Sequence, residues 1–472
     1  MKAIQTEEII GLLAKERGIS PDTAVYEQIR QWKAWWRGDY PPFHRFFEQD
    51  GRGGRTQRRL YSLRMAKKVC EDWAGILLNE HTCITVADSP SALFLQGENG
   101  EGGLLEDCRF WQRANALVEE AFCTGTGAIL LHLQNMRVQQ GRLLPDRRTG
   151  ITLQYIGAQG IFPLSTENGE ITEAAFCSET LHQGKKLCCL EIHTLGERGY
   201  CIENRCFEEK RGALRETGLP PGIAARLETG SRLPLFAVIR PNTVSTLGSG
   251  GLGESVFAQA LDALKGVDLA FNNFCRDFQL GGKKVFYRRS LLCDTPDGGL
   301  LAPDDICQQL FVSIGEGMPD EPPLIQEHNP ALRVQENIDG LQAQLDYLAF
   351  RCGLGSRYYR FDSGKVITAT EYAGQRQELM RNFSKHCLSL RRSIAAALRM
   401  MLWAGREALG EPVDPETPIC IRFEDSIITD RESERQRDRA DVVAGLLLPH
   451  EYRMKWYGET EEKALHMLSQ TP

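Results

Sequence analysis

Apolar residues repeat at alternating steps of three and four along three stretches in the second half of the chain. The first stretch contains Phe257, Ala260, Leu264, Val267, Phe271, Phe274 and Phe278. The second contains Ile338, Leu341, Leu345, Leu348 and Cys352, and the third contains Met380, Phe383, Cys387, Leu390, Ile394, Ala397 and Met401. This spacing keeps a narrow apolar stripe on one helix face, so it predicts three long helices. Such helices need neighbours to cover their stripes.

Residues typical of helix ends flank two of these stretches. Asn329 followed by Pro330 predicts the start of the second helix, and Gly353 predicts its end. Thr368 and Glu371 have the spacing of a capping box, in which each side chain bonds the other residue's backbone. The third helix therefore begins near residue 369, and its length predicts a rod of roughly 50 to 60 Å.

The first half has a different pattern. Tyr26, Ile29, Trp32 and Trp36 recur at helical steps, and the glycine- and arginine-rich segment DGRGGRTQRR after them is interpreted as a linker. Further helical segments then give way to short alternating runs such as KLCCLEIHTL and RLPLFAVIRP, which are typical of strands. Residues 1 to about 250 are therefore expected to form one mixed α+β domain.

Two shorter segments separate the three long helices. Residues 282 to about 328 contain the strand-like runs GKKVFYRRSLL and QLFVSIG around the helical turn PDDICQQL, which predicts a small α/β insert. The segment SRYYRFDSGKV, between the second and third helices, is too polar for a core and predicts a loop. The chain then continues with a strand, ICIRFEDSIITD, and with short helices.

Charge and cysteine usage narrow the class of protein. The net charge of −7 argues against a protein that grips nucleic acid over a broad surface, since that affinity comes from neutralising phosphates. The 15 cysteines lack C-x-x-C spacing and the first residues lack a signal-peptide pattern, so thiols in a reducing cytoplasm are expected. The longest apolar run, SIAAALRMMLWAG, is too short to cross a bilayer.

Two segments raise the alternative of an enzyme. Gly248, Gly250 and Gly253 form a G-x-G-x-x-G pattern, but seven residues separate it from the preceding strand, and Asp268 and Asp277 lie within a continuing helix. A hinge into that helix is therefore favoured over a nucleotide site.

The second segment is a cluster of potential zinc ligands, formed by His182, Cys188, Cys189, His193, Cys201 and Cys206. Alternation along a strand places adjacent cysteines on opposite faces, and no knuckle spacing brings two thiols together. Cysteines in the core of a β-hairpin are therefore favoured over a metal site, and no cofactor is expected.

Several phrases and the order of the elements resemble the portal proteins of tailed bacteriophages, of the type found in siphophages of Gram-positive hosts. The phrases are RMAKKVCEDWAGILLNE, NPALR with ENIDGLQAQLDYLAFRCGLG, VITATEYAGQRQELMRN, and FEDSIITDRESERQRDRADVVAGLL with YGETEEKA. They cover both ends and the middle of the chain.

The resemblance implies an α+β, helix-rich portal fold with named parts. Residues 1–253 would form the wing, 254–281 the stem helix, 282–330 the clip, 331–355 the second stem helix, 356–368 the tunnel loop, 369–410 the long helix and 411–472 the crown. The tunnel loop would present Arg357, Tyr358, Tyr359, Arg360 and Lys365 to DNA in the channel. The clip would present Lys283, Lys284, Arg288 and Arg289 to a terminase or an adaptor. The stripes would pack between subunits through Phe271, Phe274, Phe278, Leu341, Leu345, Leu348, Phe383, Leu390 and Ile394.

The implied function is mechanical and not enzymatic. A ring of twelve subunits at one capsid vertex would form the channel through which double-stranded DNA is packaged and ejected. Its partners would be a terminase, a head-tail adaptor and a capsid or scaffolding protein, and its place would be the virion, after assembly in the bacterial host's cytoplasm from a phage or prophage gene. A cytosolic nucleotide- or thiol-dependent enzyme that uses the glycine loop or the Cys/His cluster is the alternative, and a non-viral oligomeric scaffold is a further one.

Overall fold

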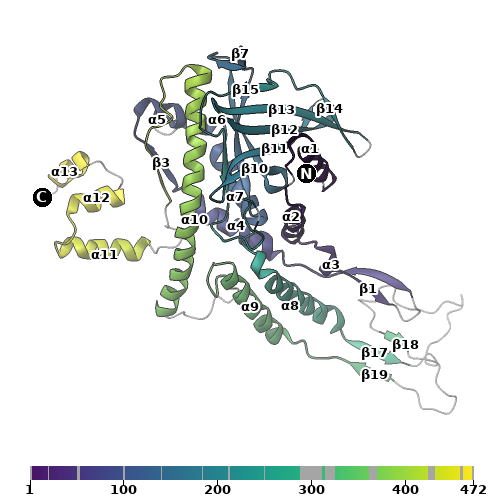
Figure 1. Cartoon of the computed structure of the whole chain (residues 1–472). Coiled ribbons are helices and arrows are strands. Elements are labelled where there is room, and N and C mark those ends of the chain that lie inside the picture. Colours follow the sequence, from purple (N-terminus) through teal and green to yellow (C-terminus); the bar gives the residue numbers. More distant parts are fainter. Residues whose placement is uncertain are drawn as a thin grey trace, which may run out of the picture.

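The computed structural model describes most of the chain (Figure 1). The described residues are 3–19, 21–49, 54–98, 101–139, 141–182, 184–210, 213–248, 250–287, 311–313, 325–360, 369–423, 431–457 and 461–469. They form a body of helices and sheets, a two-helix extension with a small sheet at its end, and a group of C-terminal helices. A mixed α+β fold, as expected, is thus confirmed.

The helices of the first part of the body bury six aromatic side chains, which are Tyr26, Trp32, Trp35, Trp73, Phe110 and Phe122. These helices are α1 (Ala3–Arg17), α2 (Thr23–Trp36), α3 (Pro41–His44), α4 (Met65–Leu77), α5 (Ser89–Gln96), α6 (Leu104–Asp107) and α7 (Phe110–Thr124). The expected stripe on α2 is confirmed, since Tyr26, Ile29 and Trp32 are buried. The side chain of Asp22 accepts a hydrogen bond from the backbone N–H of Ala24 at 2.9 Å, which caps that helix.

Two sheets pack with these helices. The smaller sheet has the order β16-β6-β9, formed by Phe236–Ile239, Gly127–Gln134 and Gly150–Gly157. The larger sheet has the order β10-β11-β12-β13-β15-β8-β7, and β14 also pairs with β13. Its strands are β7 (Arg137–Gln139), β8 (Arg142–Leu144), β10 (Ile161–Glu167), β11 (Glu170–His182), β12 (Lys185–Gly196), β13 (Gly199–Lys210), β14 (Ala213–Thr217) and β15 (Arg226–Glu228). The strand-like runs of the sequence are therefore strands.

The longest helix, α10 (Ala369–Ala404), runs along the body and ends in a π-helical turn at Gly405–Leu409 (Figure 1). Its apolar stripe lies against the smaller sheet, where the Ser393 hydroxyl donates to the Val238 carbonyl at 2.6 Å. The predicted long helix is confirmed. Thr368 lies outside the described residues, so the predicted capping box stays a prediction.

The two-helix extension consists of α8 (Leu261–Leu280) and α9 (Val334–Arg351), which pack along each other. Gly266 on α8 faces α9, since a β-carbon there would meet the side-chain amide of Gln344. The helix predicted over 254–281 begins at Leu261, after a short 3₁₀ turn. We refer to α8 and α9 together as the stem.

Of the two predicted ends of α9, the C-terminal end is confirmed and the N-terminal start is wrong. The helix ends at Arg351, and Gly353, just after its C-cap, has the expected left-handed backbone with a φ of 78°. The expected start at Asn329 and Pro330 is wrong, because the helix begins four residues later. Arg333 takes the N-cap position, and its guanidinium bonds Asp277 of α8 at 2.8 Å, which holds the segment before α9 against the end of α8.

A small sheet lies at the far end of the stem (Figure 1). Its order is β18-β17-β19, formed by Phe311–Ser313, Lys284–Tyr287 and Ile325–His328. The two predicted strands of the insert are confirmed and a third, β19, was not predicted. The predicted helical turn at PDDICQQL lies outside the described residues.

The segment interpreted as a linker forms part of a β-hairpin instead. Strand β1 (Arg45–Gln49) pairs antiparallel with β2 (Arg55–Arg59), so the described part of DGRGGRTQRR is a strand. The interpretation failed because β2 contains no apolar residue, and alternation of apolar and polar residues was the signal used for strands.

The C-terminal part divides differently from the expected crown. Strand β20 (Ile419–Arg422) pairs with β3 (Cys83–Val86), so it belongs to the body. The remaining helices, α11 (Arg431–Val443), α12 (Pro449–Tyr457) and α13 (Glu461–Ser469), stand apart from it (Figure 1). Two-residue strands β4 (Gly97–Glu98) and β5 (Glu101–Gly102) complete the described elements.

One apolar core joins the body's helices and sheets with the base of the stem. It includes fully buried Trp73, Phe110, Phe257 and Trp403. A search of the described residues finds no helix with the length and apolar character that crossing a membrane requires.

Candidate functional site

The stem exposes large apolar side chains along its outer surface. They are Leu269, Phe278, Leu280, Leu332, Val334, Ile338, Tyr347 and Phe350. Tyr347 is 65% exposed and Phe350, in the last turn of α9, is 53% exposed. Single exposed apolar residues are common, but seven of these lie on α8 and α9 and the eighth, Leu332, lies just before α9, and such a group marks a surface suited to association.

The stripe residues expected between subunits divide into two groups. Leu345, Leu348, Phe383, Leu390 and Ile394 are buried within this chain. Their assignment to contacts between subunits is therefore wrong, because periodicity shows that a face is covered but not which chain covers it. Phe271, Phe274 and Leu341 are half-buried, and Phe278 is exposed with its ring 5.1 Å from that of Phe274.

The loop expected to face DNA begins directly after α9. Tyr359 is buried, and its hydroxyl donates to Asp72 of α4 at 2.8 Å. Burial, together with the Asp72 carboxylate, raises the pKa of Tyr359, and burial raises the pKa of Tyr358 to about 12. The expectation that Tyr359 lines a channel is therefore wrong, since its side chain is anchored inside the body.

The basic residues of this loop differ from Tyr359, whereas Tyr358 is exposed like them. Arg357 and Arg360 are partly exposed, and Arg357 has a left-handed φ of 69°. Lys365 lies outside the described residues. The two arginines thus remain candidates for an anionic ligand.

The clip residues are described only in part. Lys283 forms an ion pair with Glu327 of β19, with 2.7 Å between Nζ and Oε1. Lys284 lies on β17, opposite His328 of β19. Arg288 and Arg289 lie outside the described residues. The ion pair ties the first residues of the insert to its third strand.

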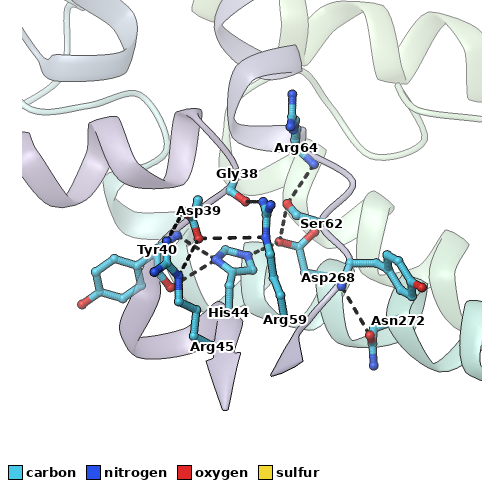
Figure 2. Close-up of polar contacts among 11 residues, drawn as sticks. Gly38, Asp39, Tyr40, His44, Arg45, Arg59, Ser62, Arg64, Asp268 and Asn272 are labelled. Atoms are coloured by element: carbon cyan, nitrogen blue, oxygen red, sulfur yellow. Dashed lines mark hydrogen bonds and ion pairs between the residues drawn. The ribbon is translucent and has the colours of Figure 1, made fainter. Parts of the chain in front are cut away.

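A buried polar network joins the β1–β2 hairpin to the stem (Figure 2). Asp268 of α8 accepts hydrogen bonds from Nε2 of His44 at 2.9 Å, from the hydroxyl of Ser62 at 2.9 Å and from the backbone N–H of Leu63 at 2.8 Å. Nδ1 of His44 accepts from the backbone N–H of Tyr40 at 2.8 Å, so the ring proton lies on Nε2. We call this set, His44, Ser62 and Asp268, the clamp.

The clamp contains the residue types of a catalytic triad without its geometry. In a triad the histidine bonds the serine hydroxyl, whereas here Ser62 and His44 both donate to the same carboxylate. His44 is fully buried, with no path to a substrate. The clamp therefore positions chain segments. Sequence reasoning missed it because His44 and Asp268 lie 224 residues apart and form no local motif.

The glycine pattern does not form a dinucleotide site. The strand that precedes it, β16, pairs antiparallel with β6, and the next strand after α8 belongs to the separate small sheet. A Rossmann unit requires parallel strands on both sides of the helix. The loop instead borders a groove of about 1050 Å³ between α10 and the β10–β11 hairpin.

The cysteine and histidine cluster lies in the larger sheet, as expected. Cys189 and Cys206 are direct partners on β12 and β13 and form a disulfide, which corrects the expectation that no two of these thiols meet. His193 is buried and bonds Glu191 at 2.7 Å. The described residues contain no cluster of three or more metal-ligating side chains.

In comparisons with known proteins, no protein-family model and no curated protein matches the chain.

Proposed function

We propose that this chain is the subunit of a phage portal, a ring through which double-stranded DNA enters and leaves a capsid. The single observation that carries the proposal is the stem, a helix pair that projects from the body with large apolar side chains on its outer surface. The small sheet at its end and the long helix α10 beside its base agree with the clip and long helix of the resemblance.

The exposed stem surface supports association with further copies. Burying apolar surface stabilises by roughly 25 cal/mol per Å², so a row of side chains such as Tyr347 and Phe350 favours a partner. A surface that is not complementary to itself associates head to tail, and such contacts close into a ring when the rotation between copies permits.

The remaining parts of the mechanism follow from this arrangement. Arg357, Arg360 and Lys365 would face DNA at the inner side of the ring. The tip of the stem, with Lys283, Lys284, Arg288 and Arg289, would contact the terminase that consumes ATP and later the adaptor. The capsid or scaffolding protein would surround the ring in the virion, and the chain itself would catalyse no reaction.

Electron microscopy of the purified protein, with native mass spectrometry, tests the proposal. We expect annular particles with a central opening and a mass of several hundred kilodaltons. Replacing the exposed stem residues by Tyr347→Ser and Phe350→Ser should convert these particles to monomers, because the apolar contact is lost. Leu181→Ser is the matched control, since Leu181 is equally exposed but lies in the larger sheet. A wild-type protein that is monomeric, or compact without an opening, would contradict the proposal.

A further inference from the structure

The β1–β2 hairpin is strongly basic in a chain that is acidic overall. Residues 45–59 contain five arginines and no lysine, against two acidic residues, whereas the whole chain has a net charge of −7. Every residue of β2 is exposed, and four of the five residues of β1 are exposed. The hairpin therefore presents both of its faces to the surroundings.

The register of the hairpin gathers arginines on one face. Alternate side chains point the same way, which places Arg55, Gln57 and Arg59 together on β2. Arg45 lies directly opposite Arg59, and Phe47 lies opposite Gln57. Phe47 is 63% exposed and the guanidinium of Arg55 lies over its ring, 5.4 Å from the centroid. The face is thus a row of guanidinium groups around one aromatic ring.

This face lacks enough carboxylates to neutralise it. Like charges directly opposite on paired strands destabilise a hairpin, yet Arg45 and Arg59 occupy such positions. Both guanidinium groups reach the same carboxylate, that of Asp39, at 2.6 and 3.9 Å. The hydrogen bond from Arg45 lowers the pKa of Asp39, so this carboxylate stays charged. Arg55 forms no ion pair within the described part of the chain.

The clamp fixes the hairpin in place. Residues on both sides of it, His44 before β1 and Ser62 after β2, bond Asp268 of the stem helix. Arg59 also donates to the carbonyl of Gly38 at 2.7 Å (Figure 2). The base of the hairpin, with Arg45 and Arg59, is therefore held to the body and α8, while Arg55 lies farther along the hairpin. A fixed base lowers the entropy lost when a ligand binds.

We propose that the arginine face of the β1–β2 hairpin binds the phosphodiester backbone of duplex DNA. Guanidinium groups donate two parallel hydrogen bonds to phosphate oxygens, and a two-stranded ribbon exposed on both faces is an element that the major groove of DNA admits. Arg55 and Arg59 lie four residues apart on β2, about 13 Å, close to four base-pair steps of 3.4 Å each.

The composition favours DNA over an acidic protein. A protein interface of standard size has an apolar centre that excludes water, whereas this face has a single aromatic ring with the guanidinium of Arg55 over it. Gln49 and Gln57, which flank that ring, can donate to phosphate oxygens or base edges. The proposal adds a DNA contact outside the loop at 356–368, and it requires only the surface of one chain and no ring.

Fluorescence anisotropy with a labelled 30-base-pair duplex, at salt concentrations between 50 and 200 mM, tests the proposal. The variant Arg55→Ala/Arg59→Ala removes the two guanidinium groups that β2 contributes to the arginine face. Arg226→Ala/Arg392→Ala removes two exposed guanidinium groups from other parts of the body and is the matched control. The melting temperature of each variant confirms that it is folded.

The expected result is that the hairpin variant binds the duplex at least about tenfold more weakly at 50 mM salt, and that its slope of log affinity against log salt falls by about two. The control variant should bind like the wild type. Absence of wild-type binding at 50 mM salt, equal losses in both variants, or binding of a poly-glutamate peptide in place of DNA would each overturn the proposal.

Particle size, measured on the same samples, separates this proposal from the portal. Rings that do not bind DNA through the hairpin would overturn the hairpin proposal alone. Hairpin-dependent binding by a protein that remains monomeric would overturn the ring alone.

Discussion

The body and the stem use the same helical spacing of apolar residues and bury it to different extents. In the body, most of the stripe of α10 is covered: Leu390, Ile394 and Met401 are buried within the chain, and Met380 is half-buried. In the stem, Leu345 and Leu348 are covered by the neighbouring helix, but Tyr347 and Phe350 on the other face of α9 are exposed. The stripe of the body helix is therefore covered within one chain, whereas α9 of the stem leaves large apolar side chains exposed.

The stability of the single chain and its proposed association with other copies depend on different regions of the molecule. A residue that is buried within one chain contributes to folding at any concentration. An exposed apolar residue contributes only when a second molecule covers it, which makes its effect depend on concentration. The proposed ring places these two contributions in two separate regions.

The largest expected effect follows from truncating a buried aromatic residue of the body. Trp73 is fully buried, and its indole N–H donates to the carbonyl of Cys352 at 3.1 Å. Trp73→Ala should lower the free energy of unfolding by about 3–5 kcal/mol, because it leaves a cavity and an unpaired carbonyl. Phe350→Ala in the stem should lower it by less than about 1 kcal/mol. Urea unfolding of dilute protein measures both values. Equal losses would contradict the expected difference between the body and the stem.

A somewhat smaller effect is expected at the clamp, where the body meets the stem. Asp268→Ala should lower the free energy of unfolding by about 3 kcal/mol, since it leaves His44, Ser62 and the backbone N–H of Leu63 without their acceptor. Hydrogen exchange should also accelerate at residues 59–64. Asp262→Ala, on the same helix but with a side chain 94% exposed, is the control and should change stability by no more than about 0.5 kcal/mol.

The smallest expected effect is a pH dependence within the body. Burial lowers the pKa of His386 to about 3, and its Nδ1 accepts from the backbone N–H of Asn242 at 3.0 Å. Between pH 6.5 and about 3 the unfolded chain binds a proton that the folded chain excludes, so stability falls as the pH falls. From pH 7 to 5.5 this residue should account for a loss of about 1 kcal/mol.

The variant His386→Gln isolates this contribution. Glutamine retains an acceptor for Asn242 but gains no proton, so urea unfolding at pH 7 and 5.5 should show a correspondingly smaller difference than in the wild type. An unchanged difference would show that the acid sensitivity of the body has another source.

Local patterns predicted the elements well and their partners poorly. The steps of three and four identified α8, α9 and α10 because the period of a helix is set by its own backbone. The same steps assigned Leu345, Phe383 and Ile394 to contacts between subunits, since a stripe carries no information about what covers it. The portal fold and function come from resemblance alone and stay a proposal.

Features that depend on distant residues or on unusual composition were missed. The hairpin strand β2 consists of exposed polar residues, so no apolar alternation marked it. The clamp joins residues that lie 224 positions apart in the sequence, and the pairing of Cys189 with Cys206 depends on the register of two strands. Neither register nor tertiary pairing follows from residue types within a short window.

The pairing of β3 with β20 gives the chain a late step in its biogenesis. In the described residues β3 pairs with β20 alone, and Val86 meets Ile419 from a segment that the ribosome makes more than 300 residues later. Until then neither edge of β3 is paired in the described residues, and another nascent chain can bind there. A chain that stops short of residue 419 should therefore aggregate more readily than one that includes β20.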